Sequence, residues 1–247
     1  MNMKIVNYKK KNSNSYKITL SSGESVILYE DIILKYNLLL KKEISDNDLK
    51  GITKDNEKYF VYYDSLKYIT KKLRTEIELR KKYKDYPSNC IDYSINRLRS
   101  EGYLNDSLYI KSFINDSINL KMDGQNKIKN NLIKLGLKEE DILDYLDTID
   151  NSIWLEKINK IINKEIKNNK KYSGLYLKNR IFSNLKNLGY FDKDIVSILN
   201  NYTFQVDESI YEREKEKAIN KYKRKYRGKE LEMKVNNYLY THGFREY

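Results

Sequence analysis

The side chains that could carry out catalysis in this chain are few and isolated. His242 is the only histidine, and it stands one residue before Gly243, a glycine expected to end a helix. A cation near a helix C-terminus interacts favourably with the helix dipole, so capping explains His242 better than general-base catalysis. Cys90 is the only cysteine, and it is better explained as a small buried hydrophobic residue. We therefore expect no catalytic residue, no metal site and no cofactor, and we do not expect an enzyme.

Clusters of basic residues are the stronger functional signal. They occur where the first predicted helix of a repeat joins the second, in the first, third and fourth repeats defined below. The candidate contact residues are Lys71, Lys72, Arg74, Arg80, Lys81, Lys82, Lys170, Lys171, Lys221, Lys223, Arg224, Lys225, Arg227 and Lys229. Equivalent positions in an array of repeats lie on one side, so these charges are expected to form a stripe that suits phosphates or an acidic protein groove. A solvated surface without a ligand is the alternative, and the weakly charged segment 121–124 of the second repeat favours it.

The overall charge agrees with binding to a polyanion but has a second explanation. Lys and Arg number 48 against 35 Asp and Glu, which gives a net charge of +13. Such an excess favours association with nucleic acid. However, Lys, Asn, Ile and Tyr all have A/T-rich codons, so an AT-rich genome would produce the same bias. The 24 tyrosines are also open to two interpretations, base stacking and packing between helices, of which we favour packing.

A recurring phrase defines the elements that position these charges. Apolar residues at every fourth position, followed by a glycine and one further apolar residue, occur three times, ending at Gly136-Leu137, Gly189-Tyr190 and Gly243-Phe244. The glycines are 53 and 54 residues apart. Each phrase predicts an amphipathic helix that ends at a glycine in the left-handed conformation. Units that recur at this period are expected to stack into an elongated, curved array of three-helix repeats.

The same pattern sets the domain boundaries. We expect an N-terminal extension over 1–60, three-helix repeats over 61–105, 106–151 and 152–207, and a truncated fourth repeat over 208–247. The extension has three short segments rich in β-formers, at 4–8, 16–20 and 25–29, with a turn signal at 21–24. They predict a small antiparallel sheet covered by a short helix over 30–36. The predicted fold is therefore mostly α with a small β region.

Helix boundaries are predicted from capping residues. A polar helix is expected to start at Asp46 and run toward Tyr59. Thr75, Ser88 and Asp106 are expected to act as N-caps of the helices that follow them.

No segment predicts a membrane or a secretory location. No apolar run reaches the length of a membrane span, and the N-terminus lacks the apolar core of a signal peptide. A single cysteine suits a reducing compartment. We expect a cytoplasmic protein.

Several of these segments together resemble the bacterial RecX family. The segment 73–79, Leu-Arg-Thr-Glu-Ile-Glu-Leu, resembles the family's Arg-Ser-Glu-x-Glu-Leu signature, with Thr75 in place of serine. The segment 95–106, which ends in Gly102-Tyr103-Leu104-Asn105-Asp106, resembles the segment that closes the family's first repeat. The second repeat, with Gly124 and Gly136, is also similar, and the strands followed by 31–38 resemble the extension of RecX proteins from low-GC Gram-positive bacteria.

This resemblance implies a regulatory protein without catalytic activity. RecX proteins consist of tandem three-helix repeats, bind along the groove of the RecA recombinase filament and restrain filament growth and strand exchange. The implied setting is homologous recombination, DNA repair and the SOS response. The expected partners are the RecA filament and single-stranded DNA, with duplex DNA as a further candidate, and the protein is expected to be a monomer. The alternative is a helical DNA-binding protein that acts without RecA, because three-helix units resemble helix-turn-helix folds.

Overall fold

The protein is mostly helical. The computed structural model describes residues 2–244, which form twelve helices and one four-stranded antiparallel sheet. This confirms the predicted fold class, whereas the end of the predicted fourth repeat, 245–247, lies outside the described residues, as does Met1. The chain divides into an N-terminal unit, Met1–Tyr109 with Leu135–Leu137, and a C-terminal unit, Ile110–Lys134 with Lys138–Tyr247.

The N-terminal unit begins with a sheet whose strand order is β3-β2-β1-β4. Its strands are β1 (Asn2–Asn12), β2 (Ser15–Leu20), β3 (Ser25–Tyr29) and β4 (Glu43–Ser45). The first three strands were expected. The fourth was not, because three residues are too few to show an alternating pattern. The β2–β3 turn contains Gly23 at φ 87°, in agreement with the predicted hairpin.

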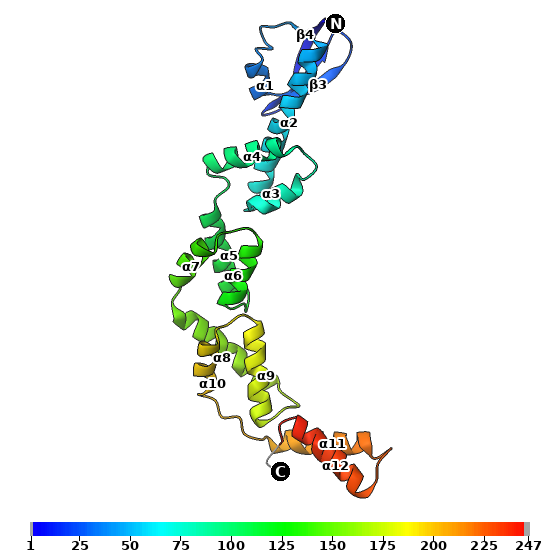
Figure 1. Cartoon of the computed structure of the whole chain (residues 1–247), viewed down its shortest axis with the longest axis vertical. Coiled ribbons are helices and arrows are strands. Elements are labelled where there is room, and N and C mark those ends of the chain that lie inside the picture. Colours follow the sequence, from blue (N-terminus) through cyan, green and yellow to red (C-terminus); the bar gives the residue numbers. More distant parts are fainter. Residues whose placement is uncertain (1, 245–247) are drawn as a thin grey trace. The chain divides into compact units, whose positions relative to one another are not determined.

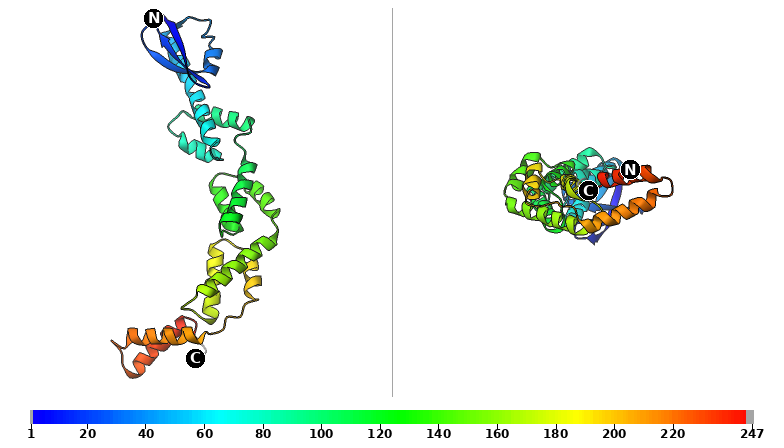
Figure 2. Two further views of the ribbon diagram at one scale, coloured as in Figure 1. Left: turned by 180° about the vertical axis from the view of Figure 1, so that it is seen from behind. Right: turned by 90° about the horizontal axis from the view of Figure 1, so that it is seen from below.

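Cross-strand register separates the two faces of this sheet. Tyr8, Ile18 and Val26 lie opposite one another on β1, β2 and β3, and they pack into the core beneath α1 (Glu30–Lys35) and α2 (Asp46–Ile69). Successive residues of a strand point to opposite faces, so the next row of residues faces away from this core. The two helices lie in front of the strands in Figure 1, and the strands lie in front in the rear view of Figure 2.

Helix α2 is longer than the sequence indicated. It starts after Ser45, whose hydroxyl accepts a hydrogen bond from the backbone N–H of Asp48 at 3.0 Å, and it continues without a break to Ile69. The helix expected to run toward Tyr59 and the first helix of the repeat expected from 61 are therefore one element. It continues because Tyr59 packs into the sheet core and Tyr62 into the core that α2 forms with the next two helices. The predicted boundary at 60/61 falls inside it.

The first repeat is completed by α3 (Glu76–Lys82) and α4 (Ser88–Ser100). Thr75 forms the predicted cap of α3 as part of a capping box: its hydroxyl accepts from the N–H of Glu78, and the Glu78 carboxylate accepts from the N–H of Thr75 at 2.9 Å. The prediction that Ser88 caps α4 was wrong. Pro87 is the N-cap and Ser88 the first helical residue, because the fixed φ of proline already directs the chain into the helix.

Eight further helices follow α4 in the described part of the chain. They are α5 (Asp106–Leu120), α6 (Gln125–Lys134), α7 (Glu139–Asp147), α8 (Asn151–Asn168), α9 (Gly174–Asn187), α10 (Asp192–Leu199), α11 (Glu208–Tyr222) and α12 (Gly228–Thr241). The prediction that Asp106 caps α5 was wrong: the side chain of Asn105 accepts the N–H of Leu108 at 2.9 Å, and Asp106 is already helical. The apolar residues of the recurring phrase are buried as predicted, with Ile128, Leu132, Ile181 and Leu185 at 0% exposure.

The glycine that closes each phrase forms a contact with the preceding repeat. Gly189, after α9, has φ 90° and lies against the first turn of α6, where a β-carbon would come within 2.5 Å of the Lys127 nitrogen. Gly243, after α12, lies in the same way against Ser173 at the start of α9. In the N-terminal unit, Gly136 lies against the side chain of Ile77. At Gly189 and Gly243 the recurring glycine therefore allows both the left-handed turn and the close approach of two backbones, whereas at Gly136 the close neighbour is a side chain.

Backbone hydrogen bonds reinforce these contacts in the C-terminal unit. The N–H groups of Gly124 and Asn126 donate to the carbonyls of Leu188 at 2.7 Å and Gly189 at 2.9 Å. The N–H of Ser173 donates to the carbonyl of His242 at 3.0 Å. The carbonyl end of one helix thus satisfies free N–H groups at the start of another.

A buried lysine strengthens the junction between the second and third repeats. Lys157 of α8 is 8% exposed, and its ammonium donates to the carbonyl oxygens of Ile118 at 2.5 Å, Lys121 at 2.7 Å and Ser117 at 3.3 Å. Burial lowers the pKa of Lys157, while the three carbonyls at the C-terminal end of α5 favour its charged form. Within 2–244, no helix is both long and apolar enough to cross a membrane.

Candidate functional site

The basic residues of the first repeat are partly occupied by ion pairs. Arg74 pairs with Glu78 at 2.9 Å and lies over the ring of Tyr68. Arg80 pairs with Glu76 and with Asp92, both at 2.8 Å. These hydrogen bonds raise the pKa of Arg80 and commit its guanidinium to contacts within the repeat.

Lys82 is engaged in the same way. Its ammonium lies 2.6 Å from the carboxylate of Asp64, which also accepts a hydrogen bond from the Tyr83 hydroxyl at 2.7 Å. Burial alone would raise the pKa of Asp64, but these two donors hold it below its usual range. Lys71, Lys72 and Lys81 are exposed, and none of them pairs with a carboxylate of the described residues. Three of the six predicted residues in this repeat are therefore available to an external partner.

Lys170 and Lys171 lie in the loop that joins α8 to α9. Asn169 shapes this loop, because its side chain accepts from the N–H of Tyr172 at 3.0 Å and donates to the Tyr172 carbonyl at 2.7 Å. Both lysine side chains are exposed beside an open pocket of about 240 Å³, which Lys164 and Arg180 also line. Four cations and one carboxylate, that of Glu165, line the pocket, so its net charge is positive. Such a pocket can bind an anionic group of a ligand.

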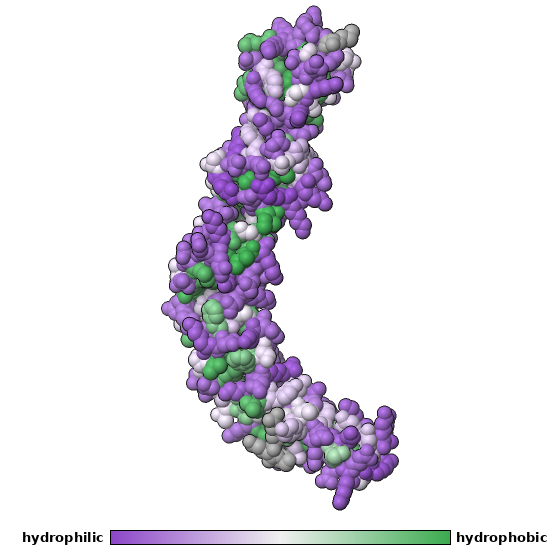
Figure 3. Space-filling view, in the orientation of Figure 1, coloured by the Kyte–Doolittle hydropathy of each residue, from purple (hydrophilic) through white to green (hydrophobic). Residues whose placement is uncertain are grey.

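The fourth repeat carries the densest positive charge, at the tip of the hairpin formed by α11 and α12 (Figure 1). Lys223, Arg224, Lys225 and Arg227 lie in the connecting loop, with Lys221 and Lys229 in the flanking helix ends. All six side chains are exposed, and the surface of the hairpin is mostly hydrophilic in Figure 3. No carboxylate of residues 2–244 pairs with any of these six. The tip is a concentrated, uncompensated set of cations.

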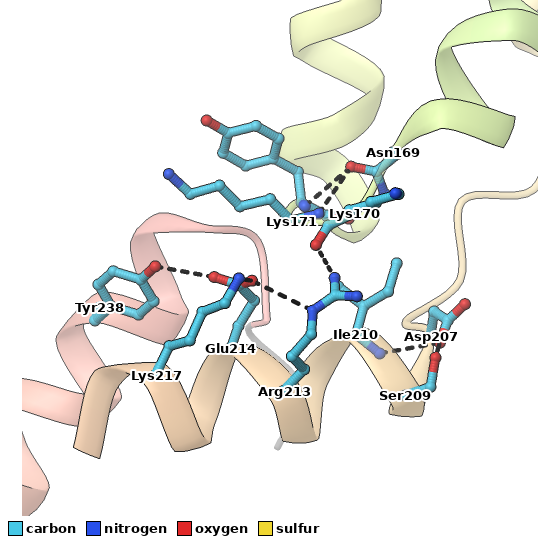
Figure 4. A network of polar contacts seen from close by, with 11 residues as sticks. Asn169, Lys170, Lys171, Asp207, Ser209, Ile210, Arg213, Glu214, Lys217 and Tyr238 are labelled. Atoms are coloured by element: carbon cyan, nitrogen blue, oxygen red, sulfur yellow. Dashed lines mark hydrogen bonds and ion pairs between the residues drawn. The ribbon is translucent and has the colours of Figure 1, made fainter. Parts of the chain in front are cut away.

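The third and fourth junctions are connected but do not form one surface. Arg213 of α11 donates to the backbone carbonyl of Lys170, so the start of α11 is attached to the α8–α9 loop (Figure 4). The loop at Lys223 begins ten residues later, about 15 Å further along the helix axis. The basic residues of the two junctions are therefore separate clusters.

The second junction is weakly charged because it has a structural role. The carbonyl of Lys121 accepts from Lys157, the carbonyl of Met122 accepts from the Tyr190 hydroxyl at 3.2 Å, and Asp123 pairs with Lys127 at 2.7 Å. These contacts join the loop to the third repeat, while Lys121 and Met122 stay exposed, Met122 at 51%.

His242 and Cys90, the isolated ionisable groups of the sequence, pack within the fold. His242 is the C-cap of α12, and its ring stacks on Tyr238 at 4.0 Å and on Tyr172 at 5.6 Å. Cys90 is 3% exposed, and burial raises the pKa of its thiol. Over the described part of the chain, no group of three or more His, Cys, Asp or Glu residues is placed to bind a metal.

Sequence reasoning missed one further basic surface. Lys9, Lys10, Lys11 and Lys17 lie together on the N-terminal sheet, beside an open depression. Their spacing in β1 and β2 was visible, but only the strand register brings Lys9 opposite Lys17.

Comparisons with known proteins give a consistent result over nearly the whole chain. No protein-family model matches the sequence. The chain is 28% identical over 249 residues to a protein named regulatory protein RecX from Streptococcus agalactiae serotype Ia, covering 98% of this chain and 95% of that protein. It is 29% identical over 253 residues to the protein of the same name from Streptococcus pneumoniae strain Hungary19A-6, with the same coverage of 98% and 95%.

Two solved structures are similar in fold. A crystal structure of regulatory protein RecX matches with a TM-score of 0.71 and 21% identity, over 80% of this chain and 99% of that one. The crystal structure of RecX from Lactobacillus salivarius matches with a TM-score of 0.53 and 25% identity, over 60% of this chain and 97% of that one.

Proposed function

Because the chain belongs to the RecX family of regulatory proteins, we propose that it binds the RecA filament on DNA and modulates, mainly by inhibition, its work in recombination and repair. The observation that carries this proposal is the likeness to RecX proteins over 98% of the chain, which includes the N-terminal sheet and all four repeats. The proposal places the protein in the cytoplasm as a monomer that has no catalytic activity of its own.

The exposed junctions support this proposal by their charge and their separation. The hairpin tip at 221–229 and the loop at 170–171 are two distinct basic sites on one unit, and a filament repeats its binding surfaces at regular intervals. Several weak contacts on one chain then act together, because each bound site raises the effective concentration of the next. In this mechanism the cations contact acidic side chains of the filament groove or DNA phosphates.

The direct test is a titration of this protein into RecA that is hydrolysing ATP on single-stranded DNA. We expect the ATPase rate and strand exchange to fall as the protein is added, at concentrations at which it does not coat the DNA by itself. An ATPase rate and a strand-exchange yield that stay constant up to a large molar excess would contradict the proposal.

A comparison of affinities separates this function from that of a DNA-binding protein that acts alone. We expect tighter binding to the RecA filament than to the same oligonucleotide without RecA. Sequence-specific binding to duplex DNA, with no preference for the filament, would favour the alternative.

A further inference from the structure

The outer face of the N-terminal sheet carries a cluster of lysines that the proposed function does not use. An open depression of about 600 Å³ is lined by Lys9, Lys10, Lys11, Lys17, Ser25 and Ile27. Residues 2–29, which form the three-stranded part of the sheet, contain five lysines and a single acidic residue, Glu24, which lies in the β2–β3 turn. The depression is therefore strongly cationic.

Strand register concentrates this charge. Lys9 of β1 lies directly opposite Lys17 of β2, and Lys17 lies opposite Ile27 of β3. Like charges on directly opposed residues of a sheet destabilise it. None of the four lysines forms an ion pair with any residue of 2–244, although Lys4 on the same strand pairs with Glu43 at 3.8 Å. The sheet therefore maintains an unfavourable charge arrangement that an anionic ligand would relieve.

Protection of an exposed strand edge does not account for the cluster. Lysines on edge strands prevent pairing with other chains. However, Lys17 lies on β2, an inner strand with β3 on one side and β1 on the other. Lys17 is exposed and precedes Ile18, which is buried in the core with α1 and α2, so its side chain points to the opposite face of the sheet.

An aromatic groove adjoins the lysines at the β1–β2 turn. It has a volume of about 550 Å³ and is lined by the turn residues 12–14 and by Tyr29, Phe60 and Tyr63. Tyr29 and Tyr63 stack at 4.8 Å with their planes 14° apart. Phe60 stacks on Tyr86 at 5.6 Å, and as a residue it is 38% exposed. Flat aromatic surfaces next to a cationic surface are the combination that binds single-stranded nucleic acid, with bases on the rings and phosphates on the lysines.

The charged residues that line the groove largely cancel. Asp64 and Lys67 both line it, and Asp64 also pairs with Lys82 at 2.6 Å, so an uncharged base suits the groove better than a phosphate. Lys11 and Asn12 are consecutive in sequence, so the lysine depression and the aromatic groove meet at one turn.

We propose that this face of the N-terminal sheet is a binding site for single-stranded nucleic acid, in which Lys9, Lys11 and Lys17 contact phosphates and Phe60 stacks on a base. The site is distinct from the junctions of the repeats and acts without RecA. Through this site the protein binds the DNA strand independently of its contacts with the filament.

The first test is fluorescence anisotropy of a labelled oligo-dT with the full chain and no RecA. We expect the variant Lys9→Glu/Lys11→Glu/Lys17→Glu to bind about tenfold more weakly at low salt. The slope of log K against log salt should fall by about 2, since each phosphate contact on a single strand contributes about 0.7.

The matched control changes the same net charge elsewhere in the same module. Lys41→Glu/Lys50→Glu/Lys54→Glu replaces three exposed lysines that lie off the sheet face, and we expect its salt slope to equal that of the wild type. If both triple variants lose the same affinity for oligo-dT, the loss reflects the overall charge of the protein, and the proposal is overturned. Circular dichroism of both variants verifies that they are folded.

The second test addresses the base contact. We expect Phe60→Ala to weaken binding to oligo-dT by about fivefold or more, the low end for one stacked base, and to leave binding to an abasic oligonucleotide unchanged. Equal losses on both oligonucleotides, or none on either, would remove the aromatic groove from the proposal.

A measurement on the wild-type protein avoids any effect of substitution on folding. Acetylation of lysines with and without oligo-dT should show protection of Lys9, Lys11 and Lys17 and unchanged labelling of Lys50. Unprotected sheet lysines would overturn the proposal. RecA is absent from all three tests, so a negative result here does not contradict the proposed action on the RecA filament. Conversely, an unchanged RecA ATPase rate would contradict that action without contradicting this binding site.

Discussion

Gly189 lies so close to Lys127 that a β-carbon on the glycine would be 2.5 Å from the Lys127 backbone nitrogen and 3.1 Å from its α-carbon. The same glycine has φ 90°, a conformation that L-residues rarely adopt. The contact joins the end of α9 to the first turn of α6, and the corresponding glycine after α12 meets the start of α9. The spacing between Gly189 and Gly243 that is visible in the sequence is therefore the spacing of two backbone contacts between repeats.

We expect Gly189→Ala to destabilise the protein by more than about 2 kcal/mol. A left-handed conformation costs an L-residue about 1–2 kcal/mol, and the overlap with the Lys127 backbone adds to that cost. Urea unfolding followed by circular dichroism measures the change.

Two other glycines separate these contributions. Gly102 has φ 80° but nothing within 4 Å of the position that a β-carbon would take, so Gly102→Ala should lose about 1 kcal/mol, the conformational cost alone. Gly51 is inside α2 with open space around it, so Gly51→Ala should stabilise the protein by about 0.5–1 kcal/mol. If Gly189→Ala costs no more than Gly102→Ala, the close approach of the backbones is not an energetic constraint.

Replacement of the buried Lys157 should loosen the junction of the second and third repeats. Lys157→Met keeps the aliphatic packing but removes three hydrogen bonds to the carbonyl end of α5. Hydrogen bonds from charged groups contribute more than neutral ones, and buried carbonyls would lose their partner, so we expect a loss of about 2 kcal/mol in the free energy of unfolding.

The control for this substitution is Lys160→Met on the same helix. Lys160 is exposed, and among the residues that the structure describes it pairs only with Glu156, at 2.6 Å. A change within about 0.5 kcal/mol is expected there. Comparable losses in the two variants would mean that the carbonyl contacts of Lys157 contribute little.

The fourth repeat should lose stability in acid because of Glu214. This side chain is 1% exposed, and it accepts hydrogen bonds from Lys217 at 2.7 Å and from the Tyr238 hydroxyl at 2.9 Å (Figure 4). Burial alone would raise the pKa of Glu214, but these donors hold it below the ordinary value of 4.5. Since the folded pKa is the lower one, the stabilisation is complete above pH 4.5 and is lost as the pH falls through the folded pKa.

We expect Glu214→Gln to be less stable than the wild type at neutral pH but less sensitive to acid below pH 4.5. Glu216→Gln, which changes an exposed glutamate on the same helix, should retain the acid sensitivity of the wild type. Chemical denaturation at neutral and acidic pH measures both. Identical pH profiles for wild type and Glu214→Gln would exclude this carboxylate as the source.

Charge reversal at the hairpin tip tests the contact with the filament. Changing Lys223, Arg224, Lys225 and Arg227 to Glu should weaken binding to the RecA filament steeply and flatten its dependence on salt, because these exposed cations have no carboxylate partner within the described residues. Binding isotherms at several salt concentrations measure both quantities.

A second set of substitutions controls for total charge. Lys111, Lys134, Lys138 and Lys193 are exposed lysines away from the junctions of the first and second helices, and their change to Glu alters the net charge equally. We expect this variant to keep most of its affinity. If the tip variant binds the RecA filament as tightly as this control variant does, the hairpin tip is not part of the interface.

Much of the local structure could be predicted because it depends on neighbours in sequence. Ile128 and Leu132 are one helical turn apart, and both are fully buried on the predicted face. Thr75 caps α3 because Glu78, three residues later, completes the capping box. The predictions that Ser88 and Asp106 are caps were wrong because in each case the residue before occupies the cap position. Pro87 precedes the first helical residue of α4, and the side chain of Asn105 accepts the N–H of Leu108 in the first turn of α5.

The positions of the basic residues could be predicted from the sequence, but not which of them form ion pairs within the protein. Sequence placed Lys82 and Lys223 in equivalent regions of their repeats, yet Lys82 pairs with Asp64, 18 residues earlier on another helix, whereas Lys223 has no such partner among the described residues. The period of a helix says nothing about which carboxylate of a different helix will lie within ion-pair distance.

The sequence by itself determined the helical class, the repeat, the glycine stops and the density of charge at the hairpin tip, because these follow from spacings within one turn or one loop. Only the tertiary structure decided that α2 continues from the sheet into the first repeat, that Lys157 is buried at the end of α5, and that Lys9 lies opposite Lys17. These features depend on register and packing between segments far apart in the chain, and the free energy of such contacts is set by geometry that no local pattern contains.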